Sequence, residues 1–262
     1  MSRFHLVRAP IRLSDLDRWA SERGWARRGN SRVGIDRGRA LHHLLTEVFG
    51  PGVMRPFRLM VPPGSLSGNL YAYTHKDGEA LRDAAAHFAW PDHSSVLDAA
   101  GIIAKPMPKQ WREGQRLGFD VQTRPVRRVS RPIRTKEGKL VGEKPGGGPM
   151  ELDAFRLKEL RDSEAGITRQ DVYLDWLAER LDSAARLDRS ASRLVRYLRV
   201  PVLRGRKIID GPDAVFHGEL TVNDPVAFAR LLQRGVGRHR AYGYGMVLLR
   251  PPQRASVRRT RN

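Results

Sequence analysis

The order of strand and helix patterns along this chain of 262 residues constrains its fold more than any other feature. In the first half, apolar runs predict strands, and apolar residues at helical spacing between capping residues predict helices. The best-marked helix follows Asp36, a typical N-cap, and ends at Gly50-Pro51. The six segments, in the order strand, helix, strand, strand, helix, strand, are 4–12, 36–49, 55–61, 69–74, 77–88 and 102–107. This order predicts a ferredoxin-like fold, an open sheet with two helices on one face.

The same order is expected a second time after residue 113. Its segments are 117–127, 168–181, 198–203, 214–221, 225–234 and 246–249. Thr168 and Asp224 are suitable N-caps for the two helices, and Gly235 can close the second one. The sequence therefore predicts an α+β protein of two tandem ferredoxin-like (RRM-like) domains. We expect them at 1–112 and 113–250, followed by a disordered basic tail at 251–262.

Charge indicates the kind of partner. The chain has 48 Lys and Arg against 28 Asp and Glu, which gives a formal net charge of +20. Such an excess favours polyanions, and the predominance of arginine favours bidentate contacts with phosphate. Because the chain has no cysteine and its histidines are scattered, neither a metal site nor a cofactor is expected. No apolar run predicts a membrane span or a signal peptide, so we expect a cytoplasmic protein without a membrane partner.

A glycine-rich, arginine-studded loop at 235–245 lies between the last helix and the last strand. Glycines allow backbone amides to approach a ligand closely, and the interleaved cations supply positive charge. The pattern predicts contact with a nucleic-acid backbone, although a flexible loop before an edge strand is the alternative. The residues expected to contact RNA are Gly235, Gly237, Arg238, His239, Arg240, Gly243 and Gly245.

Two further basic segments are candidates for RNA binding. Arg186, Arg189, Arg193 and Arg196 are spaced to lie on one face of a helix, where they could follow a phosphate backbone. A Pro/Gly/Lys-rich excursion at 128–149 contains Arg128, Arg131 and Arg134, with a plausible hairpin tip at 136–139. For the excursion, a surface loop of no particular role is an equally good interpretation.

The helix at 36–49 carries two adjacent histidines. At 100° per residue, His42 lies about 90° from the apolar stripe, whereas His43 points almost opposite to it. A histidine beside a basic surface is a candidate general acid or base because it titrates near neutral pH. Periodicity alone nevertheless favours two solvent-facing histidines on an amphipathic helix.

Several segments together resemble the CasE family, the CRISPR repeat-RNA endoribonucleases of type I-E surveillance complexes. The glycine-rich loop with Met246–Leu249 is similar to the C-terminal signature of the wider CRISPR RNA-processing superfamily. The segments at 216–224, 181–186 and 41–49 are similar to the CasE branch. The resemblance is strongest over 171–250 and weakest over 13–35 and 130–165.

This resemblance implies two tandem ferredoxin-like domains and a metal-independent endoribonuclease. Such enzymes cut precursor CRISPR RNA at the 3′ base of the repeat hairpin by attack of the upstream 2′-hydroxyl, leaving a 2′,3′-cyclic phosphate. They commonly keep the crRNA product and join the subunits of a CRISPR effector complex; a monomer is expected before assembly. The family's catalytic histidine falls on His42.

The sequence departs from the CasE pattern near that histidine. Arg39 stands where family members often have a tyrosine, and the arginine-rich segment at 14–32 is not typical. Both features fit the related type IV CRISPR processing proteins, so Arg39 and Arg23 are further catalytic candidates. A non-catalytic protein that holds a structured RNA is the competing hypothesis.

Overall fold

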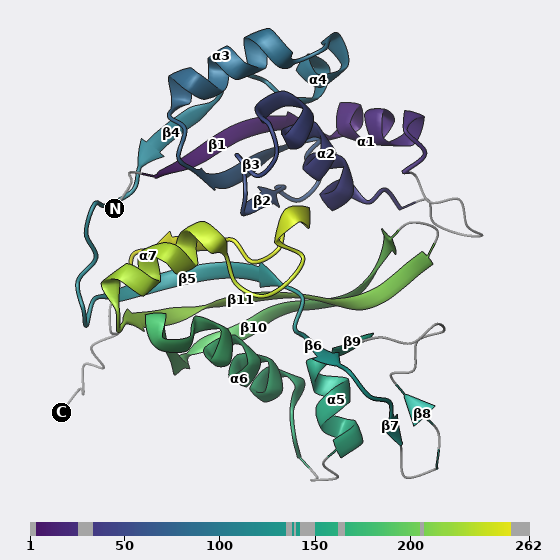
Figure 1. Ribbon diagram of the computed structural model, residues 1–262, viewed down its shortest axis with the longest axis vertical. Coiled ribbons are helices and arrows are strands. Elements are labelled where there is room, and N and C mark those ends of the chain that lie inside the picture. Colours follow the sequence, from purple (N-terminus) through teal and green to yellow (C-terminus); the bar gives the residue numbers. More distant parts are fainter. Residues whose placement is uncertain are drawn as a thin grey trace, which may run out of the picture.

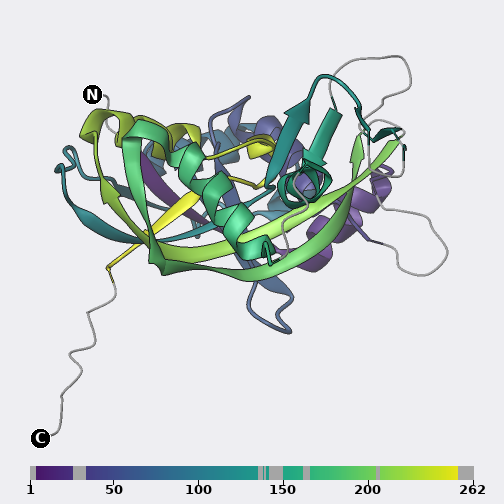
Figure 2. The ribbon, with the colours of Figure 1, turned by 90° about the horizontal axis from the view of Figure 1, so that it is seen from below.

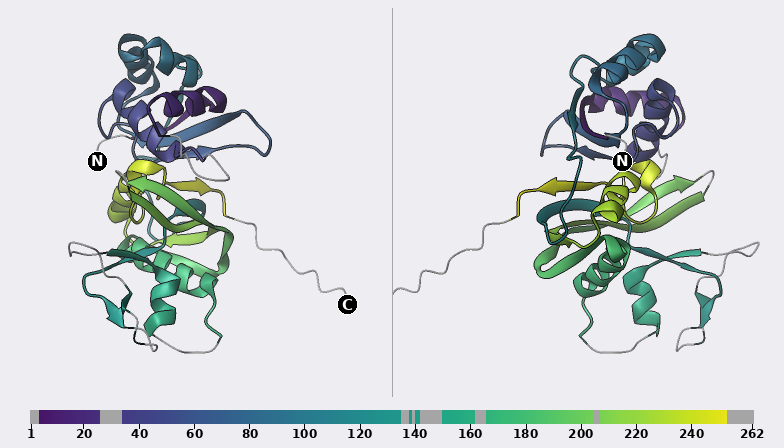
Figure 3. Two further views of the ribbon diagram at one scale, coloured as in Figure 1. Left: turned by 90° about the vertical axis from the view of Figure 1, so that its right-hand side faces the viewer. Right: turned by 60° about the vertical axis from the view of Figure 1, so that its left-hand side comes forward.

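The computed structural model describes residues 4–25, 34–134, 138, 140–141, 150–161, 166–204 and 207–252. Figure 1 shows two sheets with their helices, one above the other, and a smaller unit around α5 at the end remote from the N-terminal sheet. Most of the basic tail that begins at residue 251 lies outside the described residues. Figure 3 shows from two further sides that the N-terminal unit lies beside the C-terminal sheet and away from α5.

The N-terminal sheet has the order β2-β3-β1-β4 with antiparallel neighbours. Its strands are β1 (His5–Arg12), β2 (Phe57–Met60), β3 (Ser67–Thr74) and β4 (Ile103–Pro106). The apolar residues that alternate along β1 are buried against helices α1 (Leu13–Glu22), α2 (Arg37–Phe49) and α3 (Gly78–Phe88). Strand order and helix placement confirm the ferredoxin-like fold predicted for this half.

The helix starts follow the capping residues, with one exception. Asp36 accepts a hydrogen bond from the Arg39 amide, as predicted, and Asp77 caps α3 in the same way. The exception is α1, which begins at Leu13 directly after β1 and whose N-cap, Arg12, makes no side-chain hydrogen bond. The burial of Leu16 and Trp19 in the core holds this helix instead. A further short helix, α4 (Pro91–Val96), follows α3.

The C-terminal sheet repeats the topology in the order β10-β11-β5-β12. Its strands are β5 (Arg116–Thr123), β10 (Ala185–Arg204), β11 (Lys207–Val222) and β12 (Val247–Arg250). Helices α6 (Arg169–Leu181) and α7 (Pro225–Arg234) share one core with it, and their caps are Thr168 and Asp224 as predicted. The second ferredoxin-like fold is thereby confirmed. Figure 2 shows that the β10–β11 hairpin is much longer than the other strands and extends past β5 as a curved arm.

The helix predicted for Arg186, Arg189, Arg193 and Arg196 is wrong, because all four lie on strand β10. A bulge explains why their spacing resembles that of a helix. The pairing of β10 with β11 shifts register between Asp188 and Arg193, so the strict alternation of a strand is broken there. Asp188 accepts hydrogen bonds from two amides of the bulge, and the Ser192 hydroxyl accepts one from the Glu219 amide. All four arginines are exposed.

The excursion between β5 and α6 contains two short antiparallel ribbons and a helix. Strands β6 (Val126–Val129) and β9 (Met150–Asp153) pair with each other, β7 (Ile133–Arg134) pairs with β8 (Leu140–Val141), and α5 (Ala154–Arg161) follows. The predicted hairpin is thus present as β7–β8, although most of its tip lies outside the described residues. Arg134 donates a hydrogen bond to the carbonyl of Gly138 in that tip.

A buried ion cluster joins the two sheets. Arg58 leaves β2 on the face opposite to Phe57, which is buried among the helices, and donates to Asp120 of β5. Arg250 donates to the same carboxylate, and His217 Nε2 lies 2.8 Å from it. The Tyr73 hydroxyl also donates to the Val247 carbonyl across the boundary, at 2.8 Å. Separating the two sheets would leave the buried charges of Arg58 and Asp120 without a partner, which is costly. The ion cluster and the Tyr73 hydrogen bond therefore hold the two sheets in one relative position.

Candidate RNA-processing site

The backbone of the glycine-rich loop explains its glycines. Gly235, Gly237, Gly243 and Gly245 all have positive φ angles between 75° and 86°, which L-residues with side chains rarely adopt. A Cβ on Gly237 would lie 2.8 Å from the Trp176 ring, so the loop packs directly on the core. All four glycines of this loop are therefore required by the fold of the loop itself.

Two of the loop's glycine amides are already paired within the protein. The Gly235 amide donates to the Leu231 carbonyl at 2.7 Å, and the Gly245 amide donates to the Gln122 carbonyl at 2.7 Å. The amides of Val236 and Tyr242 are paired within the loop as well. Contacts between the loop and RNA stay a prediction, and their amide donors would have to come from the other residues of the loop.

Glu151 of β9 holds the cationic part of the loop. Its carboxylate accepts hydrogen bonds from Arg238 and from His239, whose Nε2 lies 2.6 Å away. The bond from His239, followed by that from Arg238, lowers the pKa of Glu151 to about 2. The excursion thus contacts the loop through one carboxylate. No motif marked Glu151 in the sequence, because it acts on residues far along the chain.

Arg240 lies on the other side of the loop among further cations. Its guanidinium donates to the Arg234 carbonyl at 2.9 Å. Burial lowers the pKa of Arg240, and the charges of Arg234, Arg55 and Arg238 lower it further. This corner of the molecule therefore concentrates positive charge, and Arg55 is a member that sequence reasoning missed.

His42 lies against this loop, which is distant in sequence. The ring of Tyr242, in the short 3-10 helix η2 (Arg240–Tyr242), meets the His42 ring edge-on at 5.3 Å between centroids. His42 also lines a small cavity together with Thr46, Arg55 and Ala241. The contact is close because α2 has glycine at position 38, where a Cβ would lie 2.6 Å from the Tyr242 carbonyl oxygen. The predicted histidine and the predicted loop are thus brought together.

The two other catalytic candidates, Arg39 and Arg23, lie beside the tryptophan rings of the N-terminal unit. His43 stacks on Trp25 at 4.5 Å, and the Arg39 guanidinium lies 5.3 Å from the same ring. Arg23 packs 4.0 Å over Trp19 and lies 3.7 Å from Glu47. Arg39 is one helical turn before His42, whereas Arg23 is engaged by Glu47 and Trp19.

The arginines of β10 differ in their partners. Arg189 pairs with Asp175 of α6, and Arg196 donates to Asp213 at 3.0 Å. Arg186 and Arg193 are exposed on the same strand. The four residues therefore do not form one uniform stripe, because half of them are engaged by acidic neighbours.

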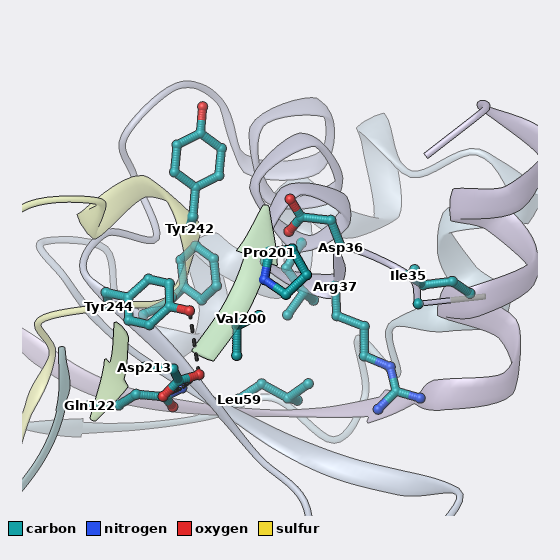
Figure 4. Close-up of a pocket in the computed structure, with 15 residues that line it drawn as sticks. Ile35, Asp36, Arg37, Leu59, Gln122, Val200, Pro201, Asp213, Tyr242 and Tyr244 are labelled. Atoms are coloured by element: carbon teal, nitrogen blue, oxygen red, sulfur yellow. Dashed lines mark hydrogen bonds between the residues drawn. The ribbon is translucent and has the colours of Figure 1, made fainter. Parts of the chain in front are cut away.

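A cavity of about 410 Å³ lies between the start of α2, the β10–β11 arm and the loop. Figure 4 shows the Tyr244 hydroxyl directed at Asp213, and Tyr242 pointing away from that pair. Gln122 donates its amide to both oxygens of Asp213 at 2.9 Å. Burial raises the pKa of Tyr244, so this hydroxyl stays protonated at neutral pH. The cavity shares Tyr242 with the His42 corner.

Within the described ranges, no three histidine, aspartate or glutamate side chains lie close enough together to bind a metal ion. No helix in that part of the chain is long and apolar enough to cross a membrane.

The family model of CRISPR associated proteins matches residues 5–251. The match spans nearly the whole chain, and the protein belongs to this family of CRISPR-associated proteins. A sequence comparison with curated proteins found no significant match.

Solved structures of CRISPR proteins share the fold. A structure of the CRISPR endoribonuclease Cse3 bound to 19 nt RNA superposes with a TM-score of 0.59 at 18% identity, covering 94% of this chain and 100% of that one. Thermus thermophilus Cse3, bound to an RNA representing a pre-cleavage complex, gives 0.58 at 18% identity and covers 95% and 100%. Cas6e from Escherichia coli K-12 gives 0.56 at 17% identity and covers 94% and 99%. The chain thus belongs to the CRISPR-associated family and shares the fold of these Cse3 and Cas6e structures, in agreement with the resemblance noted from the sequence.

Proposed function

We propose that this protein is a metal-independent endoribonuclease that binds the repeat hairpin of precursor CRISPR RNA and cuts it at the 3′ base of the stem. It keeps the product and carries it, from a monomeric state, into a CRISPR effector complex. Arg186, Arg193 and the excursion are assigned to the duplex, and the glycine-rich loop to the backbone near the cut.

The reaction is an internal transfer. The 2′-oxygen upstream of the cut attacks phosphorus, and the bond from phosphorus to the 5′-oxygen of the next nucleotide breaks. The 2′-hydroxyl loses a proton and the leaving 5′-oxygen gains one, which leaves a 2′,3′-cyclic phosphate and a 5′-hydroxyl. We assign one of these two proton transfers to His42, since imidazole accepts and donates protons near neutral pH.

The negative charge that develops on the phosphorane requires cations close by. Arg39 is one turn from His42 on the same helix, and Arg240 lies in the loop that His42 contacts. We assign Arg39 to orienting the 2′-hydroxyl and Arg240 to stabilising the phosphorane, which can contribute about 3 kcal/mol. Arg23 is a weaker candidate because it is 3.7 Å from Glu47, which offsets its charge.

One observation supports this proposal most: the His42 ring meets Tyr242 of the glycine-rich loop, in a corner that Arg55 and Arg240 make positive. The family and the fold support it further, because the similar Cse3 structures hold RNA, in one case as a pre-cleavage complex. The alternative is a non-catalytic protein that only holds a structured RNA.

An endoribonuclease and a non-catalytic RNA-binding protein are distinguished by incubating the protein with a labelled repeat hairpin in EDTA. We expect one cut, a cyclic-phosphate end, and no cut when the nucleotide upstream of the site is 2′-deoxy. Binding of the deoxy RNA should survive, which separates loss of the nucleophile from loss of affinity. Tight binding with intact ribose RNA in every condition would establish the binding protein instead.

A further inference from the structure

Arg55 lies where two cavities meet. It follows α2, is exposed, and lines the small cavity that also contains His42 and Ala241. On its other side, Arg55 lines a second cavity of about 240 Å³. Gly52 borders both cavities, so the two spaces adjoin along one short segment of the chain.

The second cavity has apolar walls from Phe4, Val53 and Tyr73, and its polar groups are basic or neutral. Its walls come from the segment after α2, the turn between β3 and α3, and the end of α7, and they contribute Arg55, Thr74, His75, Lys76 and Gln233. His75 and Lys76 are exposed at its rim, whereas Thr74 is buried. None of the described residues that line this cavity is acidic. A polyanion is the ligand that such a set of groups attracts.

The position of the second cavity relative to the loop indicates which part of a bound RNA would reach it. Figure 1 shows the β10–β11 arm to the right of the loop that carries η2, and the start of α3 together with α7 to its left. The arginines assigned to the duplex lie on β10. An RNA that places its stem there and its scissile phosphate at His42 therefore continues, past the cut, towards Arg55 and the second cavity.

We propose, on the basis of the endoribonuclease function proposed above, that Arg55, His75 and Lys76 bind the single-stranded RNA segment immediately 3′ of the cut. Contact is with phosphates, because the three side chains are exposed and supply positive charge and hydrogen-bond donors at the rim of the cavity. The site therefore accepts any downstream sequence. Arg55 bridges this segment and the scissile phosphate.

The charge density around Arg55 supports an anionic occupant. Arg55, Arg234 and Arg238 all act on Arg240, and like charges held together in this way are costly until an anion pairs with them. A phosphate between Arg55 and Arg240 would relieve that repulsion next to His42.

The test compares two repeat hairpins, both 2′-deoxy upstream of the cut so that binding is measured without cleavage. One RNA ends one nucleotide past the cut and the other continues for six more. We expect the wild-type protein to bind the longer RNA about tenfold more tightly at low salt, because extra phosphates are neutralised. In Arg55→Ala, and in the double variant His75→Ala with Lys76→Ala, the ratio of the two Kd values should fall to about one.

Lys109→Ala is the matched control. Lys109 is exposed, carries the same charge and lies outside both cavities, so this variant should keep the wild-type ratio. Each ratio is taken on one protein preparation, so a partly unfolded variant does not imitate the effect. Equal Kd values in the wild type, or a preserved ratio in both cavity variants, would overturn the inference. Flank-dependent binding with no cleavage of ribose RNA would instead overturn the proposed enzyme and keep the cavity as an RNA site.

Discussion

The two flanks of α2 differ in what their histidines contact, although His42 and His43 are adjacent in sequence. His42 meets Tyr242 and shares a cavity with Arg55, at the boundary with the C-terminal domain. His43 stacks on Trp25 within the N-terminal domain. One flank therefore adjoins a cationic cavity that a phosphate can enter, and the other is filled by the protein's own aromatic ring.

The carboxylates near the two flanks sharpen this contrast. Glu151 bonds an arginine and a histidine of the loop that His42 contacts, and Glu47 lies near Arg23 and His93 on the side of His43. Glu151 bonds both partners directly, whereas Glu47 is hydrogen-bonded to His93 at 2.9 Å but lies 3.7 Å from its arginine, and its side chain is 39% exposed. The loop is therefore fixed from outside the N-terminal domain, while the other flank is held within it by ring packing and by the bond between Glu47 and His93.

The largest expected effect separates the two histidines. Replacing His42 with alanine should lower the single-turnover cleavage rate by about 10² to 10⁴, the usual loss when an acid–base group is removed, with little change in RNA affinity. His43→Ala, and His87→Ala on the exposed end of α3, should each lower it by less than about fivefold. Equal losses in His42→Ala and His43→Ala would show that the two histidines do not differ in their role in cleavage. Activity that survives His42→Ala but not Arg39→Ala would move the chemistry to the arginines.

The next effect concerns the two carboxylates. The pKa of Glu151 falls from 4.5 to about 2 on folding, so its ionised form stabilises the protein at pH values above the ordinary pKa of 4.5. We expect Glu151→Gln to lose about 1 to 3 kcal/mol of unfolding free energy at pH 7, measured by urea denaturation. That difference should shrink as the pH falls from about 4.5 towards about 2, where the wild-type carboxylate becomes protonated.

Glu47→Gln is the matched substitution for this measurement. Its loss should stay below about 1 kcal/mol, because glutamine can keep the 2.9 Å hydrogen bond to His93 and the ion pair with Arg23 is long and exposed. A larger loss in Glu47→Gln than in Glu151→Gln would show that Glu47 holds its flank more strongly than Glu151 holds the loop.

Local patterns predicted much of the fold but little of the contacts between its parts. Alternation and capping residues such as Asp36 and Thr168 predicted both ferredoxin-like folds, because these signals act within a few residues. The helix expected at Arg186–Arg196 failed for a physical reason: the bulge held by Asp188 and Ser192 breaks strand alternation and leaves a spacing that imitates a helical face. Short-range periodicity does not distinguish a helical face from a bulged strand.

For the candidate site too, the sequence could indicate individual residues but not the contacts between them. His42 and the glycine-rich loop could be singled out from sequence, the first through a family resemblance and the second through its composition. That they touch, through Gly38 and Tyr242, follows only from the packing of two domains. Glu151 and Arg55 carried no motif, because their role depends on neighbours that the chain brings from other elements.

The smallest expected effect tests whether His43 is as enclosed as its stacking indicates. Burial lowers the pKa of His43 from its ordinary value of 6.5, and the charges of Arg39 and Arg23 act in the same direction, against that of Glu47. A group whose pKa is lower in the folded state binds its proton more readily when unfolded. The stability that His43 contributes is therefore present above pH 6.5 and declines as the pH falls below that value.

The His43→Phe variant keeps an aromatic ring on Trp25 and cannot titrate. We expect the wild type to lose more unfolding free energy than this variant between pH 7.5 and pH 5.5, with a difference below about 1 kcal/mol. Parallel pH profiles for the two proteins would show that His43 titrates as a solvent-facing residue, and the distinction between the flanks would then rest on His42 alone.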